Sequence, residues 1–243
     1  MMVRPLITFL GLCVFWQAIV SLLSIPHFIL PGPLLVFREL ATSPELYLKH
    51  GIITATEILS ALVIGLLLGF AAGVAIWKSA KVERWIWPLL LVSQAIPVFA
   101  IAPLLVVWFG YGMASKITMA VMIVFFPVSV AVVEGLRQIG PYWSQQAVLM
   151  RARREKLFWS IQLRQSLPTI AVGARIAAAT APIGAIVGEW VGSSSGLGFL
   201  MLHANARMQV SSVFAALFCL VLFTLIVYAG VNILFQKLIY WKN

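Results

Sequence analysis

Charged residues, cysteine and histidine are scarce in this sequence, and each shortage excludes a class of protein. Only 10% of the 243 residues are charged, whereas an ordinary soluble domain is about 25% charged. The two cysteines, Cys13 and Cys219, both lie in apolar runs, and the three histidines are far apart along the chain. The sequence therefore predicts neither a soluble globular domain nor a disulfide framework or metal site.

Motifs for chemistry are missing as well. The sequence has no G-x-x-x-x-G-K-[ST] phosphate loop and no H-E-x-x-H zinc motif. The run GSSSGLG (192–198) is superficially similar to a nucleophile elbow, but it follows an expected membrane helix instead of a strand. We interpret it as a flexible external loop. We expect no catalytic residues, no enzymatic activity and no cofactor held by this chain.

Long apolar runs take the place of these features. Hydrophobic residues make up 62% of the chain, and the mean hydropathy is +1.03. A helix needs roughly 20 apolar residues to cross a bilayer, and the runs are continuous instead of alternating as in barrel strands. We interpret the first run as a retained span, because it is too long for a signal peptide and no A-x-A cleavage site follows. We expect an all-α membrane protein with six spans: Leu6–Ile25, Ile52–Trp77, Trp85–Phe109, Ile117–Val133, Ile170–Val191 and Val213–Phe235.

The distribution of positive charge predicts the orientation of these spans. If the N-terminus is cytoplasmic, 12 Lys and Arg residues fall inside and 4 fall outside, which is the asymmetry of the positive-inside rule. Both termini and the loop 134–169 are then cytoplasmic, and the loops 26–51 and 192–212 are external. The net charge of +10 follows from the cytoplasmic loops, so it indicates no nucleic-acid partner. The four external cations are Arg38, Lys49, Lys116 and Arg207.

Small residues recur in two of the expected spans. Glycines at every fourth position leave one helical face without side chains, so a neighbouring helix can approach closely. Packing within the chain is favoured over dimerisation, but the pattern does not name the neighbouring helix. The glycines are Gly65, Gly69 and Gly73 in the second span, and Gly184, Gly188 and Gly192 at the end of the fifth.

Proline recurs in the third span, at Pro88, Pro97 and Pro103. Each proline removes a backbone donor and tends to kink a helix. A broken helix at this depth is tolerated where neighbours or a cavity satisfy the freed carbonyl groups. Both a helix that lines a transport path and a static kink remain open.

Polar groups inside the spans are the candidates for a substrate path, since exposure to lipid costs about 3 kcal/mol for each charge. Gln94 lies in mid-span beside the proline breaks, and Glu189 with Trp190 would suit a heteroaromatic amine by charge and stacking. A carboxylate that pairs with a nearby cation is the alternative, and Arg175 would favour anions instead. The candidates are Gln94, Pro97, Glu57, Glu189 and Trp190.

One dense basic segment, MRARREKLFWSIQLRQSLP (150–168), stands out from the apolar chain. Its apolar residues fall on one side at helical spacing, which predicts a short amphipathic helix outside the membrane. Three interpretations of the segment are open. It lies on lipid headgroups as an interfacial helix, it is a solvated loop that sets the orientation of the spans, or it docks into a partner's groove through Leu157, Phe158 and Trp159.

This segment resembles the cytoplasmic EAA loop of binding-protein-dependent ABC importer permeases. The first triplet is Gln145-Gln146-Ala147 instead of Glu-Ala-Ala, and Arg151 stands where the family has Gly. LPGPLLVFREL (30–40), SQAIPVFAIAPLLVVWFGYGMASK (93–116) and GARIAAATAPIGAIVGEWVGSSSGLGFLM (173–201) resemble the same family. Their order is similar to that of the nitrate, sulfonate, taurine and thiamine-pyrimidine-precursor subgroup, with hydroxymethylpyrimidine permeases the most similar.

The resemblance implies a single ABC importer transmembrane domain over 1–243, in the bacterial inner membrane and surrounded by its lipid. It implies two cytoplasmic ATPase subunits that hold ATP and Mg, a second permease copy in a homodimer, and a periplasmic binding protein that docks on 26–51 and 192–212. The coupling helix lies in the loop 134–169, between the fourth and fifth helices. The residues implied to contact the ATPase are Ala147, Arg151, Arg154, Leu157, Phe158, Ile161 and Leu163.

The implied substrate is a small polar solute, and a thiamine-precursor pyrimidine is favoured. The same machinery importing nitrate, taurine or an alkanesulfonate is one alternative. A self-contained secondary transporter is another, but inverted repeats and midplane ionisable residues would be expected of it.

Overall fold

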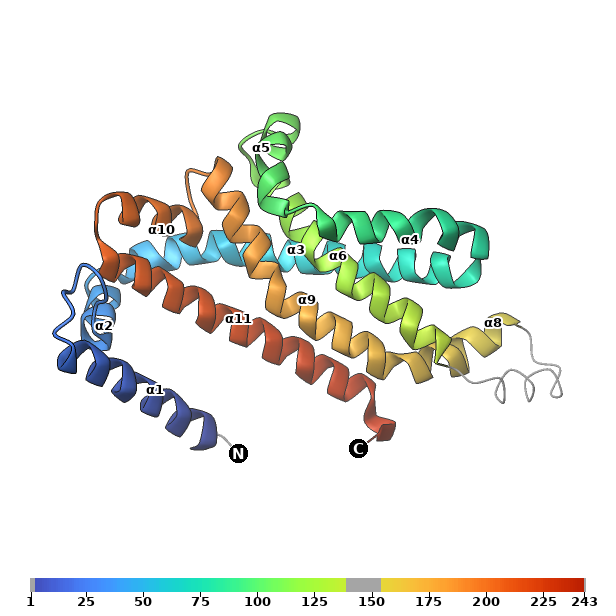
Figure 1. Cartoon of the computed structure of the whole chain (residues 1–243). Helices are drawn as coiled ribbons and strands as arrows, with labels where there is room; N and C mark the ends of the chain where they lie inside the picture. The colour runs from blue at the N-terminus through green and yellow to red at the C-terminus, as the bar shows by residue number, and fades with distance from the viewer. Residues whose placement is uncertain (1–2, 139–153, 243) are drawn as a thin grey trace.

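The computed structural model describes residues 3–138 and 154–242, and every regular element in this part of the chain is a helix. Figure 1 shows an elongated bundle whose long helices run roughly along one axis. In chain order the elements are α1 (Val3–Leu22), α2 (Pro33–Thr42), α3 (Pro44–Lys78), α4 (Ala80–Ala95), α5 (Val98–Phe109), α6 (Met113–Arg137), α8 (Arg154–Leu157), the π-helix η1 (Phe158–Gln162), α9 (Leu163–Gly192), α10 (Leu197–Ala206), α11 (Val210–Leu238) and the 3-10 helix η2 (Tyr240–Lys242).

Four helices carry the bundle: α3, α6, α9 and α11 are each long and apolar enough to cross a membrane. Helix α6 packs against both α3 and α9, and these are the two most extensive helix pairings. Small residues make this packing possible, because alanines on α9 give a flat surface that the valines of α6 can meet. The shared core includes Ile58, Val124, Val128, Val132, Ala174 and Ala178.

The expected glycine faces are confirmed, and their partner is α6. A Cβ added to Gly69 would lie 2.8 Å from Cβ of Val128, and one added to Gly188 would lie 2.9 Å from Cα of Lys116. The other glycines of both stripes meet α6 in the same way, except Gly192, which faces Val106 of α5. Packing within the chain therefore uses these faces, and no second copy is needed to explain them.

The third expected span is broken, as its prolines indicated. Helices α4 and α5 meet at an angle of 102° within Trp85–Phe109. Proline at 97 lacks the donor that would continue α4, and it forces Ile96 out of the helical region, to a ψ of 117°. Pro88 and Pro103 stay inside helices α4 and α5, so only Pro97 breaks the span.

The segments expected as long external loops also contain helices. Helix α2 and the first turns of α3 lie within 26–51, and α10 lies within 192–212. Proline at the first position of α2 and of α3 explains this, since proline favours helix starts as well as loops. The expected flexible loop 192–198 is packed instead, and Leu197 at its end is only 2% exposed.

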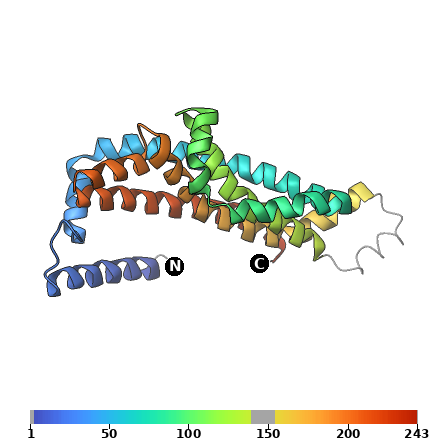
Figure 2. The same ribbon diagram turned by 45° about the horizontal axis from the view of Figure 1, so that its top comes forward.

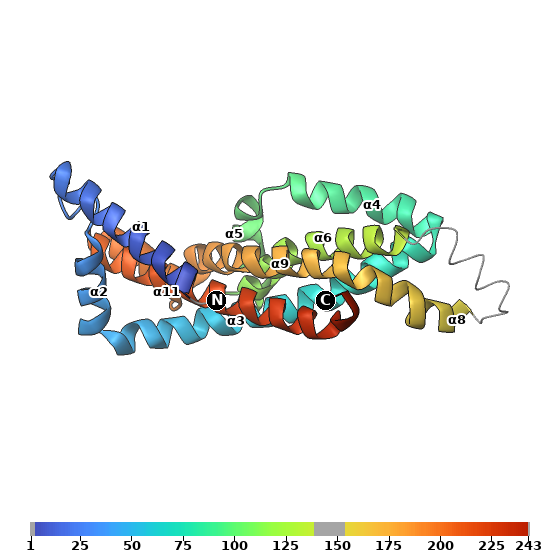
Figure 3. The ribbon, with the colours of Figure 1, turned by 90° about the horizontal axis from the view of Figure 1, so that it is seen from below.

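The two ends of the bundle differ in composition. Figures 1 and 2 show α2 and α10 at one end, and the α3–α4 turn with α8 at the other. Figure 3 shows α1 crossing α11, with the C-terminus on the α8 side. The α8 end is the one predicted to be cytoplasmic. We call it the inner end, and the end with α2 and α10 the outer end. The cations of the inner end include Lys78, Lys81, Arg84, Arg137 and Lys237.

Candidate functional site

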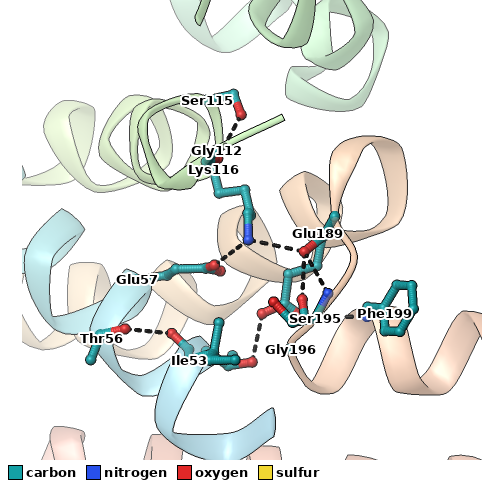
Figure 4. Close-up of polar contacts among 12 residues, drawn as sticks. Ile53, Thr56, Glu57, Gly112, Ser115, Lys116, Glu189, Ser195, Gly196 and Phe199 are labelled. Atoms are coloured by element: carbon teal, nitrogen blue, oxygen red, sulfur yellow. Dashed lines mark hydrogen bonds and ion pairs between the residues drawn. The ribbon is translucent and has the colours of Figure 1, made fainter. Parts of the chain in front are cut away.

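A buried ion pair joins α3 to α6 at the outer end. Nζ of Lys116 lies 2.6 Å from Oε1 of Glu57, and the two side chains are 4% and 0% exposed. The same ammonium group donates a hydrogen bond of 2.9 Å to Oγ of Ser193, at the end of α9. Figure 4 shows Lys116 reaching from α6 toward Glu57.

This pair corrects the expectation that Lys116 is an external cation. Helix α6 begins at Met113, earlier than the expected Ile117, so Lys116 lies in the first turn and faces the bundle. Gly188 of α9 allows the backbone at Lys116 to approach closely. The ammonium group therefore lies between helices, where Glu57 and Ser193 replace its water.

Glu189 holds the start of α10 against α9. Its carboxylate accepts hydrogen bonds from Oγ1 of Thr54 at 2.5 Å, from the N–H of Gly198, and from the N–H of Phe199 at 3.3 Å. The last two N–H groups belong to the first turn of α10, where a helix leaves its donors unsatisfied and favours negative charge. Glu189 thus acts as a cap supplied from another helix.

Two more contacts complete this outer network. The N–H of Gly196 donates to Nδ1 of His50 at 2.9 Å. The N–H of Leu197 donates to Oγ1 of Thr54 at 2.8 Å. We use "outer network" for Glu57, Lys116, Glu189 and these partners, which together tie α3, α6, α9 and α10.

The outer network changes the interpretation of two candidate path residues. Glu57 and Glu189 are 0% and 1% exposed, and their partners are a cation and helix donors. This placement favours the alternative of structural pairing. Trp190 is 48% exposed and lies on another face of α9, so the structure does not bring it together with Glu189.

Gln94 lies elsewhere, in the wall of an open groove between α4, α6 and α9. The groove has a volume of about 720 Å³, and its walls are mainly apolar. Its polar groups are Gln94, Glu134, Thr169 and Thr180. Pro97 does not line the groove, but the break that it causes ends α4 directly after Gln94. The groove is the feature of the described residues that best fits a small solute.

The coupling residues are only partly described. Ala147 and Arg151 lie outside the described residues, and Arg154 begins α8 without a described side chain. Ile161 lies in η1 and Leu163 begins α9, and both are half-buried. Leu157 ends α8 and lines a pocket of about 620 Å³ that Trp77, Lys78 and Trp159 also line.

Phe158 and its neighbour Trp159 differ in exposure, although their rings meet edge to face with centroids 5.2 Å apart. The Phe158 ring is 8% exposed. It lies 5.6 Å from the Trp77 ring, and Nζ of Lys78 is 5.4 Å from its centroid. Trp159 is 58% exposed. Phe158 therefore anchors η1 to the end of α3, whereas Trp159 is largely unpacked. The sequence carried one signal for this, the aromatic and cationic pair Trp77-Lys78 at the end of the second span.

Comparison with known proteins agrees with these features. Residues 61–240 match the family model described as "Binding-protein-dependent transport system inner membrane component". A "Probable ABC transporter permease protein" of Haemophilus influenzae is 46% identical over 239 residues, which is 98% of each chain. The "Formylaminopyrimidine transport permease protein ThiX" of Halalkalibacterium halodurans is 33% identical over 241 residues, covering 99% of this chain and 96% of that protein.

A further relative and a solved structure extend the comparison. The "Riboflavin transport system permease protein RibX" of Chloroflexus aurantiacus is 36% identical over 238 residues, 97% of this chain and 89% of that protein. A chain of the inward-facing MetNI methionine ABC transporter has a TM-score of 0.71 and 17% identity, covering 81% of this chain and 98% of that one. This likeness shows the fold. The chain belongs to the family of inner membrane components of binding-protein-dependent transport systems, and it is a permease subunit of an ABC importer.

Proposed function

We propose that two copies of this chain form the membrane path for a planar nitrogen heterocycle, and that this solute is a thiamine-precursor pyrimidine. The observation that carries this proposal is the open groove between α4, α6 and α9, whose mainly apolar walls carry a few polar groups. Two relatives that match almost the whole chain are named for formylaminopyrimidine and riboflavin, and both compounds contain planar nitrogen rings. A second copy would close the groove.

The groove suits such a solute chemically. The Gln94 amide offers both a donor and an acceptor, which can pair with the amino group and ring nitrogen of a pyrimidine. Thr169 and Thr180 add hydroxyl groups along α9, and the remaining walls are apolar surfaces for the ring faces. A few polar groups in an apolar wall orient a ligand without holding it so tightly that release is slow.

Energy would come from two cytoplasmic ATPase subunits that bind ATP and Mg. We propose that Trp159 and Leu157, beside the basic segment, dock into the ATPase. The element η1 is directly continuous with α9, and α9 carries the groove residues Thr169 and Thr180. A shift of η1 by the ATPase would therefore move one wall of the path, which is how alternating access would proceed.

The outer end would receive the binding protein. The two segments proposed for docking, 26–51 and 192–212, lie together there as α2 and α10 (Figure 1). The outer network holds α10 to α3 and α9, so this end can serve as a fixed platform. In this arrangement both termini are cytoplasmic and 1–243 acts as one transmembrane domain.

Uptake by the complete importer tests the substrate. We expect proteoliposomes with the permease, its ATPase and its binding protein to accumulate formylaminopyrimidine, but not taurine, when ATP is inside. Gln94→Leu should lower the rate about tenfold, because the wall then lacks its main polar group. Ser93→Ala on the same helix is the matched control, since Ser93 donates its hydrogen bond to the carbonyl of Leu90 within α4 and does not line the groove. Failure of any ATPase to co-purify at stoichiometric level would overturn the proposal.

Import of an anion such as nitrate, taurine or an alkanesulfonate is the second candidate. Arg175 on α9 favours it, because its buried Nε has no hydrogen-bond partner among the described residues. ATP-driven uptake of taurine in place of the pyrimidine, together with its loss in Arg175→Gln, would select this candidate.

A further inference from the structure

A small polar pocket lies where the two external segments meet. It has a volume of about 270 Å³ and is formed by His27 and Phe28 before α2, by Glu39 on α2, and by residues 208–212 between α10 and α11. We call it the outer pocket. The elements that form it, α2 and the turn between α10 and α11, lie at the opposite end of the bundle from α4 (Figure 1). The residues that matter are Glu39, Gln209, Ser211 and Ser212, with Phe28 and Met208.

The carboxylate of Glu39 is the only acidic group lining the outer pocket. Its Oε1 accepts hydrogen bonds from Oγ of Ser212 at 2.8 Å and from Oη of Tyr47 at 3.3 Å. Both donors are neutral. The ion pairs of the described residues use Glu57, Glu83 and Glu134, and none uses Glu39. His27 also lines the outer pocket, but no ion pair joins it to Glu39 among the described residues. The charge of Glu39 is therefore left for a cation from outside the described chain.

Met208 lies beside this carboxylate in a conformation that a side chain rarely adopts. Its φ is 59°, in the left-handed region just after the end of α10. Glycine is the usual residue at this position after a helix, because it has no Cβ to clash. Met208 is nevertheless 68% exposed, so its side chain gains no packing that offsets the strain. A flexible exposed methionine is a frequent feature of protein-binding surfaces.

Phe28 provides a second apolar group at the same pocket and is 49% exposed. An apolar rim above a carboxylate matches a lysine or arginine side chain, whose stem is apolar and whose head is charged. Arginine fits best, since its planar fork can bind a carboxylate at two points. Arg38 and Arg207 are exposed at the same end but do not line the outer pocket, so a matching partner would carry acidic groups around its inserted cation.

We propose that the outer pocket receives one basic side chain, an arginine or a lysine, of the binding protein that delivers the substrate. The proposal rests on the proposed function, because it names the chemistry of the docking that the function requires. Insertion of a single cation in a fixed pocket would set the register of docking and help to exclude other binding proteins.

Binding of the partner to the assembled transporter tests the proposal. The permease–ATPase complex is placed in nanodiscs, and the affinity of its substrate-loaded binding protein is measured. Glu39→Gln keeps an acceptor for Ser212 and Tyr47 but removes the charge, so we expect about tenfold weaker binding and a weaker salt dependence. Glu45→Gln, which removes an exposed carboxylate of the same docking segment that does not line the outer pocket, is the matched control and should weaken binding much less.

Met208→Gly separates docking from folding. Glycine relieves the left-handed strain, so the thermal stability of the complex should stay equal or rise. The affinity for the binding protein should nevertheless fall roughly threefold, because the rim loses its apolar side chain. Loss of stability without loss of affinity would overturn the docking role.

A charge exchange gives the decisive result. Glu39→Lys should abolish binding, and changing one basic residue on the binding protein to Glu should restore it. Unchanged affinity in Glu39→Gln, or no rescuing position among the surface cations of the binding protein, overturns this inference alone. If the binding protein fails to bind even the wild-type complex, the proposed function fails as well.

Discussion

The two ends of this permease subunit use polar and aromatic side chains in opposite ways. At the outer end Glu57, Lys116 and Glu189 are almost completely enclosed, and each has partners within the chain. At the inner end Phe158 is enclosed but Trp159 is exposed, beside an open pocket. The comparison indicates that the buried polar groups of the outer end are fixed by the chain's own contacts, whereas Trp159 at the inner end is largely unpacked.

A π-helix strengthens this contrast. The element η1 spans Phe158–Gln162 and links α8 to α9. π-Helices are rare, and as single turns inside α-helices they occur often at functional sites. The inner end thus combines an exposed aromatic group with an interruption of the regular α-helix.

Removing the buried cation should break the outer end most severely. Lys116→Met leaves Glu57 charged, buried and without its partner, which should lower the free energy of unfolding by about 3–5 kcal/mol. Thermal unfolding of the purified protein in detergent measures the change. Lys49→Met, at an exposed cation of the same end, is the control. An unfolding temperature equal to wild type in Lys116→Met would contradict the structural role of the pair.

Filling a glycine face should have the next largest effect. A Cβ at Gly184 would clash with the backbone of Ala120, which cannot rotate away, so Gly184→Ala should cost about 1–3 kcal/mol of stability. Gly230→Ala is the matched control, because a Cβ there meets nothing within 4 Å. Equal unfolding temperatures for the two variants would show that α9 and α6 are not this close.

Replacing each of the two inner aromatic residues by alanine should sharpen the comparison. Phe158→Ala removes the contact with Trp77 and should destabilise the subunit by about 3 kcal/mol. Trp159→Ala should leave stability unchanged and weaken ATPase association about tenfold. Unfolding in detergent and co-purification of the ATPase measure the two effects separately. If Trp159→Ala retains full association, the partner binds elsewhere on the inner end.

A half-exposed ion pair at the inner end should matter least. Nη2 of Arg137 lies 2.6 Å from Oε1 of Glu83, and both side chains are more than a third exposed. Water screens such a pair, so Glu83→Gln should change the free energy of unfolding by less than about 1 kcal/mol. An effect as large as that of Lys116→Met would remove the distinction between the two ends.

Sequence patterns identified the features that depend on local composition. The glycine stripes were found, and Gln94 was singled out by its position in mid-span. The role of Lys116 was missed because hydropathy places the start of the fourth span at Ile117, whereas the helix begins one turn earlier, at Met113. Nothing in the pattern could name Glu57 as its partner, since the two residues lie 59 positions apart.

The sequence by itself determined that this chain is helical, lies in a membrane and resembles an importer permease, because hydropathy, residue spacing and motif order are local properties. The tertiary structure alone decided which carboxylates are enclosed, where the third span bends, and which of two adjacent aromatics faces outward. These outcomes depend on how each helix is rotated about its axis. That rotation follows from the close contacts of α6 with the glycine faces of α3 and α9, between residues far apart in the chain.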